Sequence, residues 1–202
     1  MKRSTRWHQA TTLAFGLAFL GAAKVYAEND PQPQTRGWIP YTHAGYVGLN
    51  LGTAQHQTPC KPGFECKNPR IAGKIYTGGM ISQGIGLEAG YVNVGHGKRN
   101  GGETKAQGIN VSLVGHLPLA PQFHALVKVG GTYGWTRTSV SPKLPGEPQG
   151  KARGAALTYG AALAFDLDRR NQLLAEWDRQ QFKFASGRHR TDFYSLGWKY
   201  RF

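Results

Sequence analysis

The amino-acid sequence predicts an all-β fold, an eight-stranded antiparallel up-and-down transmembrane β-barrel. Three observations support this prediction. Several segments alternate between apolar and polar or small residues, as strands with one apolar face do. The connections between these segments alternate between long and short, which is typical of outer-membrane barrels. The mean hydropathy is only -0.45, because lipid-facing and lumen-facing residues of such a barrel cancel in the average.

The N-terminal region, residues 1–27, has the pattern of a secretory signal peptide. Basic residues near the start precede an apolar run over residues 13–23, and small residues follow near Ala27. We expect cleavage after Ala27, a polar periplasmic lead over residues 28–42, and the barrel domain over residues 43–202. The apolar run is too short for a transmembrane helix, and no other stretch approaches about 18 consecutive apolar residues.

Eight strands are expected in the barrel domain. Their ranges, in chain order, are 43–52, 73–81, 85–95, 106–117, 122–136, 153–166, 172–183 and 191–202.

Alternation supports the first, third and fourth of these strands. In the first strand, Leu49 and the other apolar residues oppose Asn50, and in the third Leu87 opposes Glu88. In the fourth strand, apolar residues stand at alternate positions, with Ile109, Val111, Leu113 and Leu117 on one face. The second strand is rich in glycine and alternates less cleanly, so its facing stays open.

The next three strands rest on similar evidence. The fifth sets Phe123, Ala125, Val127, Val129 and Tyr133 on the face opposite Lys128, and the seventh sets Leu173 against Glu176. The alanine-rich sixth segment alternates less cleanly, and its helix propensity alone would allow a helix. Gly154 and the β-forming residues near it weaken that alternative.

The eighth strand has an aromatic-rich face that ends at the C-terminus. That face consists of Tyr194, Leu196, Trp198, Tyr200 and Phe202. Aromatic residues at a strand end suit a membrane interface. We expect this strand to pair with the first and close the sheet, which removes both exposed edges. A soluble lipocalin-type barrel is the structural alternative, but its apolar face would point inward.

The expected outer connections, 53–72, 96–105, 137–152 and 184–190, hold most of the positive charge. Cleavage of the signal peptide would remove four of the 25 basic residues and none of the 11 acidic residues, which leaves a formal charge of +10. The outer connections carry the basic residues Lys61, Lys67, Arg70, Lys98, Arg99, Lys105, Arg137, Lys143, Lys151, Arg188 and Arg190. We therefore expect a cationic outer rim.

Two interpretations of the cationic rim stay open. Its side chains could neutralise phosphates of the surrounding lipopolysaccharide and outer-membrane lipids, or they could dock an anionic host polymer. No nucleic-acid partner is expected, because an exported chain meets lipid headgroups, sugars and host polymers first. Within the first outer connection, Cys60 and Cys66 read as a disulfide that closes a small loop in an oxidising compartment.

The barrel domain, residues 43–202, resembles the transmembrane domain of the OmpA-type outer-membrane proteins and, more loosely, the small OmpX-like barrels. The resemblance rests on Lys105-Ala-Gln-Gly108, Lys128-Val-Gly-Gly131, Leu87-Glu-Ala-Gly-Tyr91 and Ser195-Leu-Gly-Trp-Lys-Tyr-Arg-Phe202. The last segment is similar to the C-terminal signal that the barrel-assembly machinery recognises. The large members carry a second, peptidoglycan-binding domain, which we do not expect here because the sequence ends at Phe202.

The resemblance also implies a polar network in the lumen, linked in that family to a narrow channel. Glu88, Lys128 and Glu176 keep the charge types of the family, and Asn50 stands where a lysine is usual. Three further charged positions of the pattern are replaced by Val114, Leu174 and Ala164. Because an unpaired buried charge is costly, Glu88 and Glu176 should pair with Lys128 or another inward base. We interpret this network as structural, with a gate as the alternative.

No catalytic constellation, metal site or cofactor motif is evident in the sequence. The nearest serine and histidine pairs are Ser112 with His116 and Ser186 with His189, which keep a lipid A-modifying enzyme as a remote alternative. The predicted function is therefore non-enzymatic: support of the cell envelope and presentation of cationic surface loops. A narrow, porin-like ion channel is the main alternative.

Overall fold

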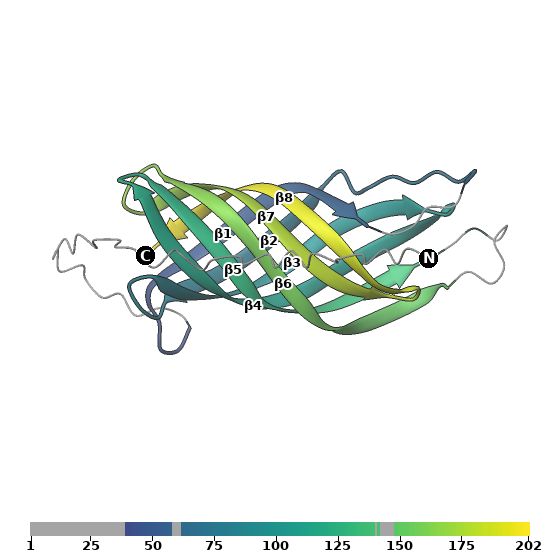
Figure 1. The fold of residues 1–202 in the computed structure, drawn as a ribbon, viewed down its shortest axis with the longest axis horizontal. Coiled ribbons are helices and arrows are strands. Elements are labelled where there is room, and N and C mark those ends of the chain that lie inside the picture. Colours follow the sequence, from purple (N-terminus) through teal and green to yellow (C-terminus); the bar gives the residue numbers. More distant parts are fainter. Residues whose placement is uncertain (1–38, 58–61, 140, 142–147) are drawn as a thin grey trace, which may run out of the picture. The chain divides into compact units, whose positions relative to one another are not determined.

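The structure is a computed structural model that describes residues 39–57, 62–139, 141 and 148–202. Eight antiparallel strands form a closed barrel in chain order (Figure 1), which confirms the predicted fold class. The strands are β1 (His43–His56), β2 (Ala72–Met80), β3 (Ile85–Arg99), β4 (Gly102–Ala120), β5 (Phe123–Thr138), β6 (Gly150–Asp166), β7 (Asn171–Phe184) and β8 (Gly187–Arg201). No helix among the described residues is long and apolar enough to cross a membrane.

The barrel closes through the first and last strands, as predicted. In the register between β1 and β8, Leu49 lies opposite Trp198 and Leu51 lies opposite Leu196. Beyond the last paired residue, the backbone N–H of Phe202 donates to the carbonyl oxygen of Gly45 at 2.9 Å. Pairing between β1 and β8 from Tyr46 to His56 removes the two edges that an open sheet would expose there.

The two ends of the barrel differ. At one end, called the turn end here, the strands are joined by residues 81–84, 121–122 and 167–170. The other end, called the extended end, is where the strands continue as projecting hairpins (Figure 1). The asymmetry is the one expected between the periplasmic and outer sides of such a barrel.

Two of the outer connections expected from the sequence, the long one over 96–105 and the moderate one over 184–190, are wrong. β3 continues to Arg99 and β4 begins at Gly102, so the segment 96–105 contains a tight hairpin. The segment 184–190 is likewise mostly strand, since β7 ends at Phe184 and β8 begins at Gly187. Apolar alternation stops where a strand projects beyond the lipid, although its backbone ladder continues, so the sequence pattern underestimates the strand length.

The outward face of the barrel is an apolar belt. Its side chains are exposed, most of them by about half. The belt includes Leu49, Leu51, Ile75, Ile109, Val111, Leu113, Val127, Val129, Leu157, Leu163, Leu173 and Leu196. The belt also settles the facing of β2 and β6: Ile75 and Leu157 point outward, whereas Lys74 and Thr158 are buried. So large an exposed apolar surface suits lipid as its solvent.

Aromatic pairs lie on both sides of the apolar belt. Near the turn end, the ring centroids of Phe123 and Phe165 are 4.9 Å apart, and those of Trp198 and Tyr200 are 6.0 Å apart. Toward the extended end, Trp135 lies 6.4 Å from the ring of a tyrosine on β3. Girdles of this kind mark the two membrane interfaces of a transmembrane barrel.

A compact hydrogen-bonded turn joins β6 and β7 at the turn end. Asp168 accepts hydrogen bonds from the backbone N–H groups of Arg170 at 2.7 Å and Asn171 at 2.8 Å, and from the Asn171 side chain at 2.8 Å. The Asn171 side chain, followed by these backbone donors, holds the pKa of the Asp168 carboxyl below its ordinary value. The turn is therefore best formed when Asp168 is ionised.

Candidate functional site

Five ionisable side chains meet in the middle of the lumen and are called the lumen ion cluster here. Lys74 Nζ lies 2.6 Å from Glu176 Oε1, 3.0 Å from Asp178 Oδ2 and 3.3 Å from Glu88 Oε1. Lys128 Nζ lies 2.6 Å from Glu176 Oε2 and 3.1 Å from Glu88 Oε1. The cluster therefore joins side chains of β2, β3, β5 and β7 across the interior.

The lumen ion cluster is sealed from solvent. Its five residues are each 4% exposed or less. Burying an ion costs several kcal/mol. The attraction within close ion pairs offsets this cost but rarely exceeds it. Two lysines shared by three carboxylates provide that pairing, so the arrangement fixes how these strands face one another across the lumen more than it adds net stability.

Two tyrosine rings complete the middle of the lumen. Lys74 Nζ and Lys128 Nζ lie 5.2 and 5.1 Å from the centroid of the Tyr76 ring. Lys199 Nζ, which has no hydrogen-bond partner among the described residues, lies 4.5 Å from the Tyr46 ring. These distances fit cation–π contacts, which contribute more when the cation is desolvated.

Apolar layers lie on both sides of the lumen ion cluster. Toward the extended end the buried layer consists of Ala54, Ala72, Val92, Val94, Ala106, Phe182, Phe184 and Phe193. Toward the turn end it consists of Val114, Leu126, Ala162, Ala164 and Leu174. The second layer contains all three residues that stand where the OmpA-type pattern would place charges. Val114, Ala164 and Leu174, where the resemblance implied charges, are thus packed in an apolar layer.

The structure brings together three of the four lumen residues singled out from the sequence. Glu88, Lys128 and Glu176 are in the lumen ion cluster, whereas Asn50 lies outside it and donates from Nδ2 to Ser195 Oγ at 3.3 Å. Sequence reasoning missed Lys74 and Asp178. The glycine-rich second strand hid the facing of Lys74, but Asp178 stands two residues after Glu176 on the same inward face and could have been found.

The cations expected on outer connections lie mostly on strands. Lys98 and Arg99 are on β3, Lys105 on β4, Arg137 on β5, Lys151 on β6, and Arg188 and Arg190 on β8. Lys67 and Arg70 lie on the connection between β1 and β2. Lys61 and Lys143 lie outside the described residues, as does Cys60, so its disulfide with Cys66 stays a prediction.

Part of the cationic surface is internally paired. Glu65 forms ion pairs with Lys67 and, at 3.6 Å, with Lys98. The Lys67 ammonium, and then that of Lys98, hold the pKa of the Glu65 carboxyl below its ordinary value. Arg99 donates to the carbonyl oxygen of His56 and to Asn68 Oδ1, both at 2.8 Å, and so ties β3 to the first outer connection.

The groups considered for catalysis do not assemble into a catalytic site. Ser186 Oγ lies 2.9 Å from His189 Nε2 at an exposed hairpin, and no carboxylate among the described residues orients this histidine by a hydrogen bond or ion pair. His116 Nε2 is buried without a hydrogen-bond partner in the described part of the chain. The described residues include no group of three or more potential metal ligands.

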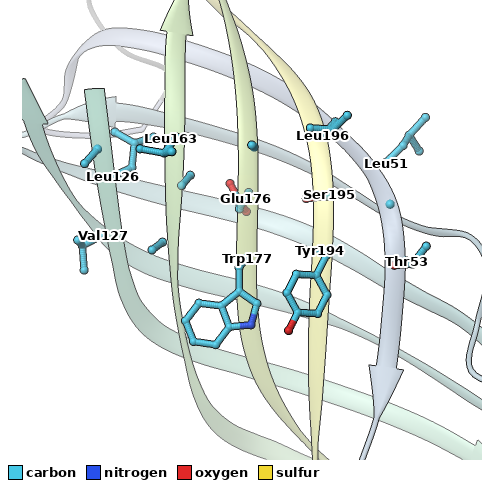
Figure 2. Close-up of a pocket in the computed structure, with 15 residues that line it drawn as sticks. Leu51, Thr53, Leu126, Val127, Leu163, Glu176, Trp177, Tyr194, Ser195 and Leu196 are labelled. Atoms are coloured by element: carbon cyan, nitrogen blue, oxygen red, sulfur yellow. The ribbon is translucent and has the colours of Figure 1, made fainter. Parts of the chain in front are cut away.

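A groove of 670 Å³ lies on the apolar outer wall over β5 to β8 and β1. Figure 2 shows the rings of Trp177 and Tyr194 side by side at one end of the groove, with Leu163, Leu196 and Leu51 at the other. Its floor is formed by small residues, chiefly alanines. The groove faces the hydrocarbon side of the barrel. Its lining includes Glu176 and Ser195, which lie opposite each other in the register, but both side chains are buried on the lumen side of the wall.

The predicted C-terminal assembly signal lies along the closing strand. Tyr194, Leu196 and Trp198 are exposed on the outward face of β8, and Tyr200 and Phe202 are half-buried. The Trp198 indole N–H donates to the side-chain oxygen of an asparagine at the start of β7, at 3.0 Å. The aromatic face is therefore displayed to lipid while the terminus itself is held at the seam.

Comparisons with known proteins agree with this geometry. The family model described as the OmpA-like transmembrane domain matches residues 40–179. None of the curated proteins matches the sequence significantly.

Several solved structures share the fold. Neisserial surface protein A is 12% identical, with a TM-score of 0.59, 78% of this chain and 97% of that chain covered. The N-terminal β-barrel domain of OprF from Pseudomonas aeruginosa is 13% identical, with a TM-score of 0.53 and coverages of 79% and 98%. Ail, the attachment invasion locus protein of Yersinia pestis, is 16% identical, with a TM-score of 0.50 and coverages of 79% and 99%. The chain therefore belongs to the family of OmpA-like transmembrane domains, the eight-stranded barrels of the outer membrane.

Proposed function

We propose that this protein is a non-enzymatic surface protein of the outer membrane, with a closed structural barrel and a cationic outer surface that contacts anionic partners. Those partners are the lipopolysaccharide phosphates around the barrel or anionic polymers of a host surface. The observation that carries the proposal is the set of exposed basic residues on the projecting strands of the extended end, such as Lys98, Arg188 and Arg190. Long-range attraction of anions by such a surface falls with ionic strength.

The packing of the lumen supports a structural role over a narrow channel. Phe182 and Phe193 are fully buried in the apolar layer toward the extended end, and the lumen ion cluster lies beneath it. An ion entering from outside would have to cross the apolar layer and then compete with ion pairs of 2.6 to 3.3 Å. A lipid A-modifying activity has less support, since the Ser186–His189 pair has no orienting carboxylate among the described residues.

The export route belongs to the same proposal. Residues 1–27 act as the signal peptide, residues 28–42 form a periplasmic lead, and the barrel-assembly machinery recognises the aromatic strand that ends at Phe202. In the oxidising compartment, a bond between Cys60 and Cys66 would stiffen the first outer connection.

The test is a binding screen of the folded barrel in neutral phosphatidylcholine nanodiscs against lipopolysaccharide, heparan sulfate and matrix proteins. A variant with Lys67, Lys98, Arg188 and Arg190 replaced by glutamine should bind its anionic partner more weakly than the parent, and salt should weaken the parent more than the variant. Heat-modifiable migration on gels would show that both are folded. Equal binding by parent and variant at every salt concentration would refute the proposal.

A further inference from the structure

Three cations lie directly opposite one another on the outer wall of the extended end and are called the cationic row here. In the strand register, Lys105 of β4 is paired with Arg137 of β5, and Arg137 is paired with Lys151 of β6. On the far side of Lys105 the register places His96 of β3. Directly opposite residues have their Cβ atoms only about 5 Å apart. The barrel thus holds three positive side chains on adjacent strands.

The cationic row has little compensation from acidic residues. Glu103 lies 3.8 Å from Lys105, and both side chains are about half exposed. No acidic side chain among the described residues forms an ion pair with Arg137 or Lys151. By contrast, Arg179 on β7 is tightly paired with an aspartate at 2.6 Å. Like charges directly opposite on adjacent strands are destabilising, so the row does not contribute to the stability of the barrel by itself.

The residues next to the cationic row change from charged to apolar within two steps along the strands. Arg153 and Trp135 are paired in the next outward-facing row, and Tyr133 and Ile109 are paired in the row after that. Each step is about 7 Å along the strand. The cations therefore lie immediately above the boundary of the apolar belt.

A groove of 530 Å³ covers this transition. Its lining includes Lys105, Arg137, Lys151, Arg153, Tyr133 and Trp135. One end of the groove is therefore suited to anions, and the other is aromatic and borders the lipid-facing surface.

We propose that this groove binds the phosphorylated sugar headgroup of an outer-leaflet glycolipid, with a phosphate on the cationic row and the acyl chains along the Tyr133 side. This inference rests on the proposed function and specifies one site and one ligand class for it. An amphipathic ligand uses both ends of the groove, whereas a soluble polyanion would use only the cations. A phosphate bound between Lys105, Arg137 and Lys151 would also relieve the repulsion within the row.

The test measures binding of lipid A to the folded barrel in phosphatidylcholine nanodiscs. The groove variant replaces Lys105, Arg137 and Lys151 with glutamine. The matched control replaces Lys183, Arg188 and Arg190 with glutamine. These residues are exposed on β7 and β8 at the same end, and their replacement removes the same number of positive charges.

The groove variant should lose about tenfold in affinity for phosphorylated lipid A, from three exposed charge contacts of about 0.5 kcal/mol each. The control should lose much less. Dephosphorylated lipid A should bind the parent as weakly as phosphorylated lipid A binds the groove variant. A third variant, Tyr133→Ser, should weaken lipid A binding and leave binding of a soluble heparin fragment unchanged.

Three outcomes would overturn the inference. Equal losses in the groove variant and the control would show a diffuse cationic surface, which sinks the site and leaves the proposed function standing. Unchanged lipid A binding in both variants would sink the site, and the separate screen with the Lys67, Lys98, Arg188 and Arg190 variant would then decide the proposed function. Equal affinity for phosphorylated and dephosphorylated lipid A would exclude a phosphate site. Heat-modifiable migration of each variant ensures that lost binding is not lost folding.

Discussion

Replacement of Lys74 by methionine should destabilise the folded barrel more than any exposed lysine replacement. Lys74 touches all three carboxylates of the lumen ion cluster. Without it, Glu88 and Glu176 still contact Lys128, but Asp178 keeps no cation within ion-pair distance among the described residues. Methionine is unbranched and of similar length, so it fills the space beside the tyrosine ring and isolates the effect of the lost charge.

The size of the effect follows from the cost of a stranded buried charge. Asp178 is 3% exposed, and removing one partner of a buried ion pair costs at most about 3 to 5 kcal/mol, because a carboxyl left without its cation can take up a proton. The second replacement Asp178→Asn removes the stranded charge, so the double variant should be more stable than Lys74→Met alone. The coupling between the two positions should be about 1 to 3 kcal/mol.

The assay is urea unfolding of the refolded barrel in lipid vesicles, followed by tryptophan fluorescence and by heat-modifiable migration. The matched control is Lys98→Met, because Lys98 is 60% exposed and its removal should change stability by no more than about 0.5 kcal/mol. If Lys74→Met unfolds at the same urea concentration as Lys98→Met, or if Asp178→Asn gives no rescue, the lumen ion cluster does not hold the interior as described.

Three further outcomes are expected. Gly197→Ala should weaken the seam between β1 and β8, because the added Cβ would overlap the side-chain oxygen of Asn50. Gly84→Ala is the control, because the Cβ added there meets nothing closer than a carbonyl oxygen at 3.8 Å. The urea midpoint of unfolding should fall for Gly197→Ala and not for Gly84→Ala. The folded-state pKa of Asp168 is lowered, so its contribution to the stability of the barrel is present above the unfolded-state pKa and is lost as the pH falls through the folded-state pKa. The Asp168→Asn variant should therefore show a smaller difference between its urea midpoints at pH 7 and pH 3 than the parent does. An unchanged difference would contradict this. Deletion of Phe202 should lower the amount of barrel in the membrane, measured by immunoblot, while the urea midpoint of the barrel that does fold changes less. Equal membrane levels with and without Phe202 would refute this.

The fold was predictable from the sequence because a lipid-embedded strand must alternate. Leu49 and Leu51 on β1 or Ile109 on β4 face lipid in every case where the pattern was clean. The same reasoning failed at the extended end, where the outward face of a strand meets water or headgroups and carries polar residues such as Lys98 and Lys105. The hairpin around residues 100–101 is held by backbone pairing between β3 and β4, and backbone pairing leaves no mark on the hydropathy pattern.

The sites were only partly predictable, for a related reason. Charges inside a narrow lumen must be paired, so Glu88 and Glu176 implied an inward base, but not that Lys74 would be a second one. The cationic row depends on the register between β4, β5 and β6, which brings together residues 32 and 14 positions apart in the chain, Lys105 with Arg137 and Arg137 with Lys151. Counting the charges in each loop separately could not reveal that alignment.

The barrel is proposed to have a sealed lumen and cationic strands that face outward from the cell. Treatment of intact cells with a membrane-impermeant amine reagent, followed by mass spectrometry of each lysine, tests both parts at once. We predict labelling of Lys98 and Lys105, which are exposed at the extended end. Lys74, Lys128 and Lys199, each 3% exposed or less, should stay unlabelled until the barrel is unfolded. Labelling of these buried lysines in the folded barrel would contradict a sealed lumen, and protection of both Lys98 and Lys105 would contradict an outward-facing extended end.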